Sequence, residues 1–292
     1  MRNLLAIVVL LFTCTVVFAK VPRAERKALI DLHASTNGEH WVKKWDLKAP
    51  VSDWYGVTVE NDHVVEINLF RNNLMGTLPK SIGDLKKLTK LNLAFNNITG
   101  ELPDGIVLLG NLKVLKLEMN KIKGELPESI GALENLEELT AFNNFLSGNI
   151  PEGIGNLTQL KTLNLSSNAL SGEIPGSLGD LVHLESLGLF ENALQGFIPR
   201  EIGNLTKMKE LVLANNQLTG AIPEEFGQLA SLQVFQIQNN KINSFENLQL
   251  MEARQFLVFD YDDGNIKTDF KDLNINNSRM ADTKFEDDIE ND

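Results

Sequence analysis

Residues 88–103 read LTKLNLAFNNITGELP, and residues 160–175 read LKTLNLSSNALSGEIP. The leucines, an asparagine, the glycine and the proline stand at the same places in both stretches. The asparagine recurs at an unbroken spacing of 24 residues: Asn72, Asn96, Asn120, Asn144, Asn168, Asn192, Asn216 and Asn240. A fixed period of this length indicates a solenoid in which each repeat is one structural unit.

Each position of the repeat has a physical reason. The pair Leu91 and Leu93 alternates at period two, which predicts a short strand with both leucines facing inward. We expect Asn96 to end that strand at a turn, where its amide satisfies backbone groups and stacks on the next asparagine. Gly100 would then permit the reversal into a return segment. Because one repeat cannot cover its own leucines, stacked neighbours must form the core.

The frame L-x-x-L-x-L-x-x-N-x-L-x-G-x-[IL]-P resembles the plant-type extracellular leucine-rich repeat of receptor ectodomains and polygalacturonase-inhibiting proteins. The resemblance covers residues 65–244, which we divide into eight repeats. It implies an α/β solenoid, a right-handed leucine-rich-repeat superhelix with a concave parallel β-sheet and an irregular or helical convex side. The sequence departs from the frame at Ala141, at Val107, and in the eighth repeat, where Phe235 and Ile237 stand without the glycine and proline.

Residues 20–64 resemble the N-terminal cap of the same family. An amphipathic helix candidate is followed by Trp41, Trp45 and Trp54, which suit the covering of an exposed solenoid end. Land-plant caps usually carry a disulfide in this segment, whereas the only cysteine of this chain is Cys14. The segment therefore resembles the cysteine-free caps of bacterial, algal and protist relatives.

The two ends of the chain differ from the repeats in composition. Residues 1–19 carry Arg2 and an apolar run of about 15 residues, which is short of the ~20 needed to span a bilayer. They predict a secretory signal peptide, so we expect a secreted, extracellular protein with no membrane span after signal cleavage. Residues 245–270 hold enough apolar side chains for a C-terminal cap, and residues 271–292 predict an acidic, disordered tail.

Charge and motifs argue against several classes of function. A net charge of −12 disfavours a nucleic-acid partner, because phosphate binding needs a basic surface. The four histidines are scattered and no catalytic or nucleotide-binding motif occurs, so we predict no catalytic residues, no metal site and no cofactor. An EF-hand reading of residues 260–264 would place Phe259 at a ligand position, which favours a polar turn there. Weak calcium binding by the acidic tail stays open.

The outward positions of the strands form the candidate binding surface, because they vary on a rigid scaffold. Exposed aromatic side chains at such positions anchor protein interfaces. Acidic and basic residues nearly cancel on this face, which favours a protein or a neutral polysaccharide over a polyanion. We predict that eight concave-face residues bind the partner: Phe70, Arg71, Asn92, Phe95, Lys116, Met119, Phe142 and Phe190.

Five Asn-x-Ser/Thr sequons are candidates for N-glycosylation: Asn97, Asn156, Asn164, Asn204 and Asn276. Asn156 and Asn204 occupy equivalent positions that we expect on the convex side, where a glycan would leave the concave face open. Asn164 lies on the strand face itself, where a glycan would obstruct binding. The same tripeptide also arises from the repeat frame without any modification.

The sequence therefore predicts a secreted, non-catalytic recognition protein whose concave face binds an extracellular protein or polysaccharide. The resemblance implies inhibition of a hydrolase, or a part in defence or signalling, as candidate roles. The alternative is an extracellular matrix or adhesion protein whose acidic tail binds calcium or mineral. A receptor ectodomain is less favoured, since neither a spanning helix nor a kinase domain follows the repeats.

Overall fold

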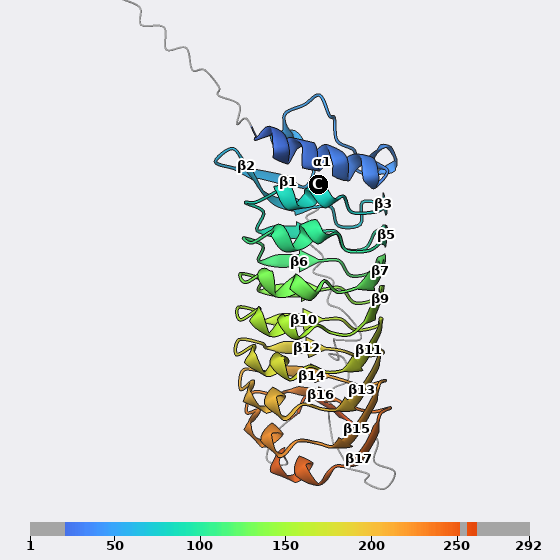
Figure 1. Cartoon of the computed structure of the whole chain (residues 1–292), viewed down its shortest axis with the longest axis vertical. Coiled ribbons are helices and arrows are strands. Elements are labelled where there is room, and N and C mark those ends of the chain that lie inside the picture. The colour runs from blue at the N-terminus through green and yellow to red at the C-terminus, as the bar shows by residue number, and fades with distance from the viewer. Residues whose placement is uncertain (1–20, 252–255, 262–292) are drawn as a thin grey trace, which may run out of the picture.

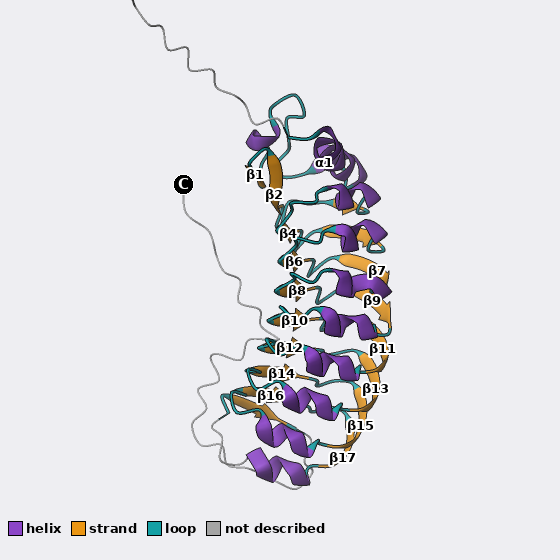
Figure 2. Cartoon of the chain, turned by 60° about the vertical axis from the view of Figure 1, so that its left-hand side comes forward, coloured by secondary structure: helices purple, strands orange, loops and turns teal. Residues whose placement is uncertain are grey.

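The computed structural model describes residues 21–251 and 256–261, which form a curved stack of coils (Figure 1). One parallel sheet lies along the inner side of the curve, and short helices with a second sheet lie along the outer side (Figure 2). The α/β solenoid expected from the sequence is confirmed. The predicted signal peptide (1–19) and acidic tail (271–292) lie outside the described residues.

The inner, concave sheet joins ten strands in the order β1-β2-β4-β6-β8-β10-β12-β14-β16-β18. β1 pairs with β2 in antiparallel fashion, and the following pairs are parallel with partners 24 residues apart, as Leu91 and Leu115 are. The bounds are β1 (Val57–Glu60), β2 (His63–Asn68), β4 (Lys90–Asn92), β6 (Val114–Lys116), β8 (Glu138–Thr140), β10 (Thr162–Asn164), β12 (Ser186–Gly188), β14 (Glu210–Val212), β16 (Val234–Gln236) and β18 (Val258–Asp260).

A second sheet of eight strands follows the repeated asparagines, where the sequence predicted a turn and a reversal. The chain does bend at each asparagine, as predicted, but the sequence did not predict that the segment after it forms a strand. The residue two places after each asparagine points inward; Ile98 and Leu170, for example, are fully buried. The glycine is the last or the next-to-last residue of the strand and has positive φ, and a Cβ on Gly100 would lie 2.8 Å from the Thr77 side chain. The strands are β3 (Met75–Gly76), β5 (Asn97–Gly100), β7 (Lys121–Glu125), β9 (Phe145–Gly148), β11 (Ala169–Glu173), β13 (Ala193–Phe197), β15 (Gln217–Ala221) and β17 (Lys241–Ser244).

The helical part consists of one α-helix, α1 (Arg23–Ser35), and short 3-10 helices in the described residues. The helices η3 to η9 each start directly after the proline of a repeat, because proline fixes φ and lacks the N–H that a first turn leaves unpaired. Their bounds are η1 (Gly38–His40), η2 (Val51–Asp53), η3 (Lys80–Asp84), η4 (Asp104–Leu108), η5 (Glu128–Ala132), η6 (Glu152–Asn156), η7 (Gly176–Asp180), η8 (Arg200–Asn204), η9 (Glu224–Gln228) and η10 (Glu246–Met251).

One apolar core runs through the whole stack, from Val21 to Met251. Both leucines of each Leu-x-Leu pair face it, as Leu163 and Leu165 do, and both are fully buried. Ala141 takes the place of a strand leucine and is buried as well. The inward direction of the leucines, on which the predicted fold depends, is confirmed.

The repeated asparagines connect each coil to the one before it through the backbone. The Asn96 amide donates from Nδ2 to the carbonyl oxygen of Leu69 at 2.9 Å, and its Oδ1 accepts from the backbone N–H of Asn72 at 3.0 Å and of Leu74 at 2.9 Å. Asn120 donates to Leu93 and accepts from Ile98 in the same way. The predicted ladder therefore exists, and its rungs run from side chain to backbone.

An aromatic cluster closes the N-terminal end of the stack. Trp45 lies 4.8 Å from both Trp41 and Trp54 between ring centroids, and the buried His33 stacks on Trp45 at 6.1 Å. Each indole N–H donates to a backbone carbonyl, for example from Trp54 to Asp46 at 2.9 Å. Ring packing thus covers the end that a disulfide would otherwise help to hold.

The C-terminal end is closed by a second aromatic group within the segment predicted as a cap. β18 continues the concave sheet by one more strand, with Phe259 directly beside Phe235 in the 24-residue register. The rings of these two residues stack at 5.7 Å, and Phe256 and Tyr261 each lie 4.8 Å from Phe259. The repeat geometry therefore extends beyond residue 244.

Candidate functional site: the concave face

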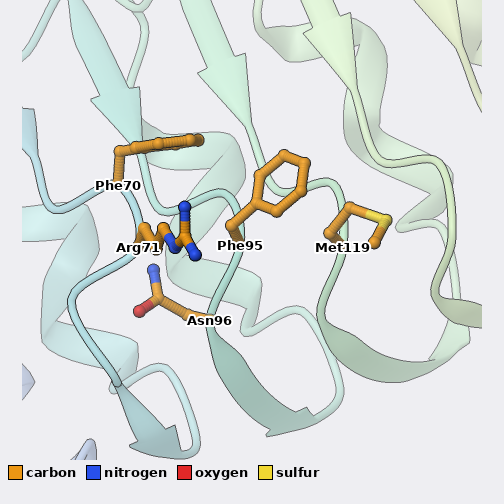
Figure 3. Close-up of a pocket in the computed structure, with 5 residues that line it drawn as sticks. All are labelled: Phe70, Arg71, Phe95, Asn96 and Met119. Carbon is orange, nitrogen blue, oxygen red and sulfur yellow. The ribbon is translucent and has the colours of Figure 1, made fainter. Parts of the chain in front are cut away.

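Four of the eight predicted binding residues meet in one open pocket near the N-terminal end of the concave sheet. Phe70, Arg71, Phe95 and Met119 line it together with Asn96, and its volume is about 390 Å³. Figure 3 shows that the residues come from three successive repeats, with the guanidinium of Arg71 on the same side as the Phe95 ring. The pocket lies where the strands end and the chain turns toward the second sheet.

The apolar walls of the pocket form a corner. The rings of Phe70 and Phe95 are 5.2 Å apart between centroids and are tilted by 60° to each other. Phe70 is 39% exposed, whereas Phe95 and Met119 are half-buried. A corner of this kind surrounds a guest side chain on two sides, and a thioether such as that of Met119 adapts its shape to what enters.

A left-handed backbone conformation sets the direction of three of these side chains. Arg71, Phe95 and Met119 have φ of 49°, 57° and 55° at equivalent places of successive repeats. Left-handed backbone costs most residues about 1–2 kcal/mol, and Asn143 and Asn215 occupy the same place in later repeats with a residue type that tolerates it. A phenylalanine and a methionine held there store strain, which is a frequent property of binding sites.

Hydrogen bonds between repeats hold this strained backbone. The N–H of Arg71 donates to the carbonyl of Ala94 at 3.0 Å, and the N–H of Phe95 donates to the carbonyl of Glu118 at 2.9 Å. The N–H of Met119 donates to Phe142 at 2.9 Å. The pocket is therefore built into the rigid scaffold.

The other four predicted residues lie outside this pocket. The Oδ1 of Asn92 accepts from the backbone N–H of Ala94 at 3.1 Å, and Lys116 pairs with Glu138 at 3.0 Å. Phe142 and Phe190 are half-buried farther along the sheet. Phe142 and Phe190 stand two residues before a repeated asparagine, as Phe70 does, but the ring that contacts Phe70 is Phe95, which stands one residue before Asn96.

Glu118 is a concave-face residue that the sequence reasoning did not select. It is 9% exposed, and the hydroxyl of Thr140 donates to its carboxylate at 2.6 Å. Burial raises the pKa of Glu118 above its ordinary value, and the hydrogen bond from Thr140 opposes that shift only in part. The signal available in the sequence was an acid two residues before a repeated asparagine, where the neighbouring repeats have Ala94 and Phe142.

Most cations of the concave sheet are neutralised by carboxylates of adjacent strands. Five of the six form ion pairs: Lys90 with Glu66 (2.9 Å), Lys113 with Glu137 (3.4 Å), Lys116 with Glu138 (3.0 Å), Lys161 with Glu137 (2.6 Å) and Lys209 with Glu185 (2.6 Å). The sixth is Arg71, for which no ion pair exists among residues 21–251 and 256–261. The uncompensated positive charge therefore lies in the pocket.

The sequons differ in accessibility. Asn156 and Asn204 are exposed in η6 and η8 on the outer side, and Asn97 is half-buried in β5. Asn164 is 6% exposed, and its Oδ1 accepts from the N–H of Ser166 at 3.1 Å, so a glycan there would disturb the packing. Asn276 lies outside the described residues.

Among residues 21–251 and 256–261, no three histidine, cysteine or acidic side chains gather closely enough to hold a metal ion. Within the same residues, no helix has the length and apolar character that crossing a membrane requires. Residues 262–264, which completed the calcium motif considered from the sequence, lie outside them.

The repeats match the model of the leucine-rich repeat region over residues 68–173 and 143–257, which together cover more than half of the chain. The chain belongs to the leucine-rich-repeat family. Among solved structures, this leucine-rich-repeat chain is similar to the ectodomain of the plant membrane receptor kinase GASSHO1/SCHENGEN3 from Arabidopsis thaliana in complex with CASPARIAN STRIP INTEGRITY FACTOR 2. The identity is 33%, the TM-score is 0.76, and the match covers 80% of this chain and 29% of that one.

Two further solved structures place the chain within the family. The Arabidopsis receptor kinase HAESA, solved in complex with the peptide hormone IDA and the co-receptor SERK1, is 29% identical, with a TM-score of 0.72 and coverage of 82% and 41%. A leucine-rich-repeat protein of Leptospira interrogans is 36% identical, with a TM-score of 0.56 and coverage of 67% and 48%. The chain thus spans less than half the length of each of these relatives. The plant-type resemblance is confirmed.

Proposed function

We propose that this leucine-rich-repeat protein acts outside the cell as a non-catalytic recognition protein that binds a protein or peptide partner on its concave face. The observation that carries the proposal is the open pocket of Phe70, Arg71, Phe95 and Met119 on a rigid sheet. Apolar pockets with one well-placed polar group are the usual form of a binding site.

The relatives support the same kind of partner. The complexes of GASSHO1/SCHENGEN3 and HAESA contain CASPARIAN STRIP INTEGRITY FACTOR 2 and the peptide hormone IDA, respectively. A fold alone does not determine function; the support here comes from the shared frame together with exposed aromatic groups on the concave side. Inhibition of a hydrolase is one form that such recognition could take.

The test is affinity capture with variants matched between the two faces. The immobilised full chain is incubated with native extracellular extract, and retained proteins are identified by mass spectrometry. The concave variant is Phe70→Ala with Phe95→Ala, which removes the two rings that form the corner of the pocket. The control variant is Phe145→Ala with Phe197→Ala, which removes two rings that are 62% and 69% exposed on the second sheet.

We expect the wild type and the control variant to retain the same partner, and the concave variant to lose at least about tenfold in affinity. All three proteins should melt within a few degrees of one another, because no fully buried side chain is removed. Equal retention by both variants, or loss confined to the control variant, would contradict the proposal.

A further inference from the structure

We propose that the pocket of Phe70, Arg71, Phe95 and Met119 recognises a peptide segment in which a carboxylate lies next to an apolar side chain. The inference deepens the proposed function and rests on it. It starts from the distribution of charge: among the cations of the concave sheet, Arg71 has no carboxylate partner in the described residues, whereas the others are paired.

The guanidinium supplies the specificity for an anion. Its planar fork presents several N–H donors that match both oxygens of a carboxylate. Phe70, Phe95 and Met119 next to it contribute no charge of either sign, so nothing in the pocket competes with an incoming anion. Arg71 is solvent-exposed, so its attraction for an anion is that of a surface charge and should weaken as salt is added.

Apart from Arg71, the side chains that line the pocket have no unoccupied hydrogen-bonding group. Asn96 is the one other polar side chain among the lining residues, and its amide is already occupied: Nδ2 donates to Leu69, Leu93 and Ala94, and Oδ1 accepts from two backbone N–H groups. Among the lining side chains, Arg71 is therefore the one with hydrogen-bond donors available to a guest, and Phe70, Phe95 and Met119 favour an apolar group beside it.

These properties favour a peptide over an acidic sugar. A uronate carries hydroxyl groups around its ring that would be left without partners beside Phe70, Phe95 and Met119, which costs free energy. In addition, the 60° tilt of the two phenylalanine rings does not form the flat platform that a sugar ring stacks on. An apolar side chain fits into the corner, and a neighbouring carboxylate reaches Arg71.

The carboxylate of such a peptide can come from two sources: the C-terminus of the chain, or the side chain of an aspartate or glutamate. Three short probes separate them: N-acetyl-Gly-Gly-Phe with a free terminus, the same peptide as its amide, and N-acetyl-Gly-Asp-Phe amide. Galacturonic acid is the fourth probe and represents the sugar alternative.

The readout is NMR of the full chain labelled at the methionine methyl groups. The Met119 signal is assigned with Met119→Leu and reports directly on the pocket. We expect at least one carboxylate-bearing peptide to shift it and to bind about tenfold or more tightly than the neutral amide, as a charge-assisted hydrogen bond predicts. Which acid probe binds identifies the source of the carboxylate.

Two variants make the result specific to Arg71. Arg71→Gln should abolish the preference for the acid over the amide, and Lys116→Gln, which removes a cation already paired with Glu138, should leave it unchanged. Equal binding of acid and amide, equal effects of the two variants, or a stronger response to galacturonic acid would overturn the inference. An unshifted Met119 signal would overturn it too, yet face-specific partner capture would still support the proposed function.

Discussion

Adjacent residues directly after a concave strand face opposite environments in this solenoid. Leu117 points into the core and is almost completely buried, whereas Glu118, the next residue, faces the concave surface. Both are nevertheless shielded from water, Leu117 by stacked coils and Glu118 by its neighbours on the sheet. Substitutions at the two kinds of position should therefore act in different directions.

For the core positions, we predict that Leu165→Ala lowers the free energy of unfolding by about 2–5 kcal/mol, because the lost methyl groups leave a cavity between neighbouring coils. Leu165 is fully buried, while Leu250, which is 57% exposed, provides the control variant Leu250→Ala. Urea unfolding followed by circular dichroism measures both. A cost for Leu165→Ala no larger than that for Leu250→Ala would show that the site is not a core position.

For the concave surface, we predict that Glu118→Gln stabilises the protein at neutral pH. Burial raises the pKa of Glu118 in the folded state, so at pH 7 the folded chain carries a charge that it disfavours relative to the unfolded chain. The amide avoids that charge and can still accept from Thr140. As the pH falls and the wild-type carboxyl takes up its proton, the advantage of the variant should disappear.

The measurement is urea unfolding of both proteins from pH 7 down to pH 4. Glu134→Gln, at an exposed position in the loop after η5, controls for the loss of one negative charge. An advantage of Glu118→Gln that is constant with pH, or equal to that of Glu134→Gln, would contradict the raised pKa.

At the scale of elements, the sequence predicted the concave strands and their register well, because the Leu-x-Leu pair and the 24-residue period leave one arrangement that buries the leucines. It did not predict the second sheet. Its strands have two to five residues, and the glycines from Gly76 to Gly220, at or next to their ends, suggested a reversal. Pairing with the neighbouring coil, which is a long-range contact, decides their conformation.

The pocket was predicted only in part for a related reason. Phe70, Arg71, Phe95 and Met119 were each selected as surface residues, but they occupy two positions of the repeat. Phe70 stands two residues before a repeated asparagine, and the other three stand one residue before. Their convergence depends on positive φ at Arg71, Phe95 and Met119. Residue type alone favours that conformation for asparagine or glycine, so the sequence contained no direct signal for it.

Among the elements, the N-terminal cap should lose stability in mild acid. Burial lowers the pKa of His33 below its ordinary value of 6.5, and the nearby Glu39 opposes this only in part. As the pH falls below 6.5, the unfolded chain takes up the proton first, so stability is lost until the pH passes the folded pKa. We predict that His33→Phe, which keeps a ring against Trp41 and Trp45, removes this part of the pH dependence.

All three tryptophans of the chain lie in the cap, so their fluorescence during urea unfolding at pH 5 to 7 reports on it specifically. His40 is exposed in the same cap, and His40→Gln is the matched control. If the control variant loses as much pH dependence as His33→Phe, burial of His33 is not the cause.

At the scale of the whole molecule, each coil contacts its neighbours, and stability follows from the sum of these interfaces. We predict that deletion of residues 145–168, one complete repeat, gives a shorter solenoid that unfolds cooperatively at a somewhat lower temperature. The reason is the uniform register: strands β8, β10 and β12 pair with identical offsets of 24 residues, so new neighbours can pair in the same way.

Deletion of residues 145–156 removes half a repeat and is the control, because it places polar residues where leucines must stack. Calorimetry and circular dichroism distinguish the two outcomes. A full-repeat deletion that unfolds as broadly as the half-repeat deletion would contradict the modular description.

The aromatic closures at both ends have a consequence for the environments in which the molecule can persist. Trp41, Trp45 and Trp54 at one end and Phe235 and Phe259 at the other are held by ring packing and hydrogen bonds, and the single cysteine of the chain, Cys14, lies outside both clusters. No bond in either cluster can be cut by a thiol reagent. The fold should therefore not depend on the thiol–disulfide balance of its surroundings, and millimolar dithiothreitol should leave its melting temperature unchanged.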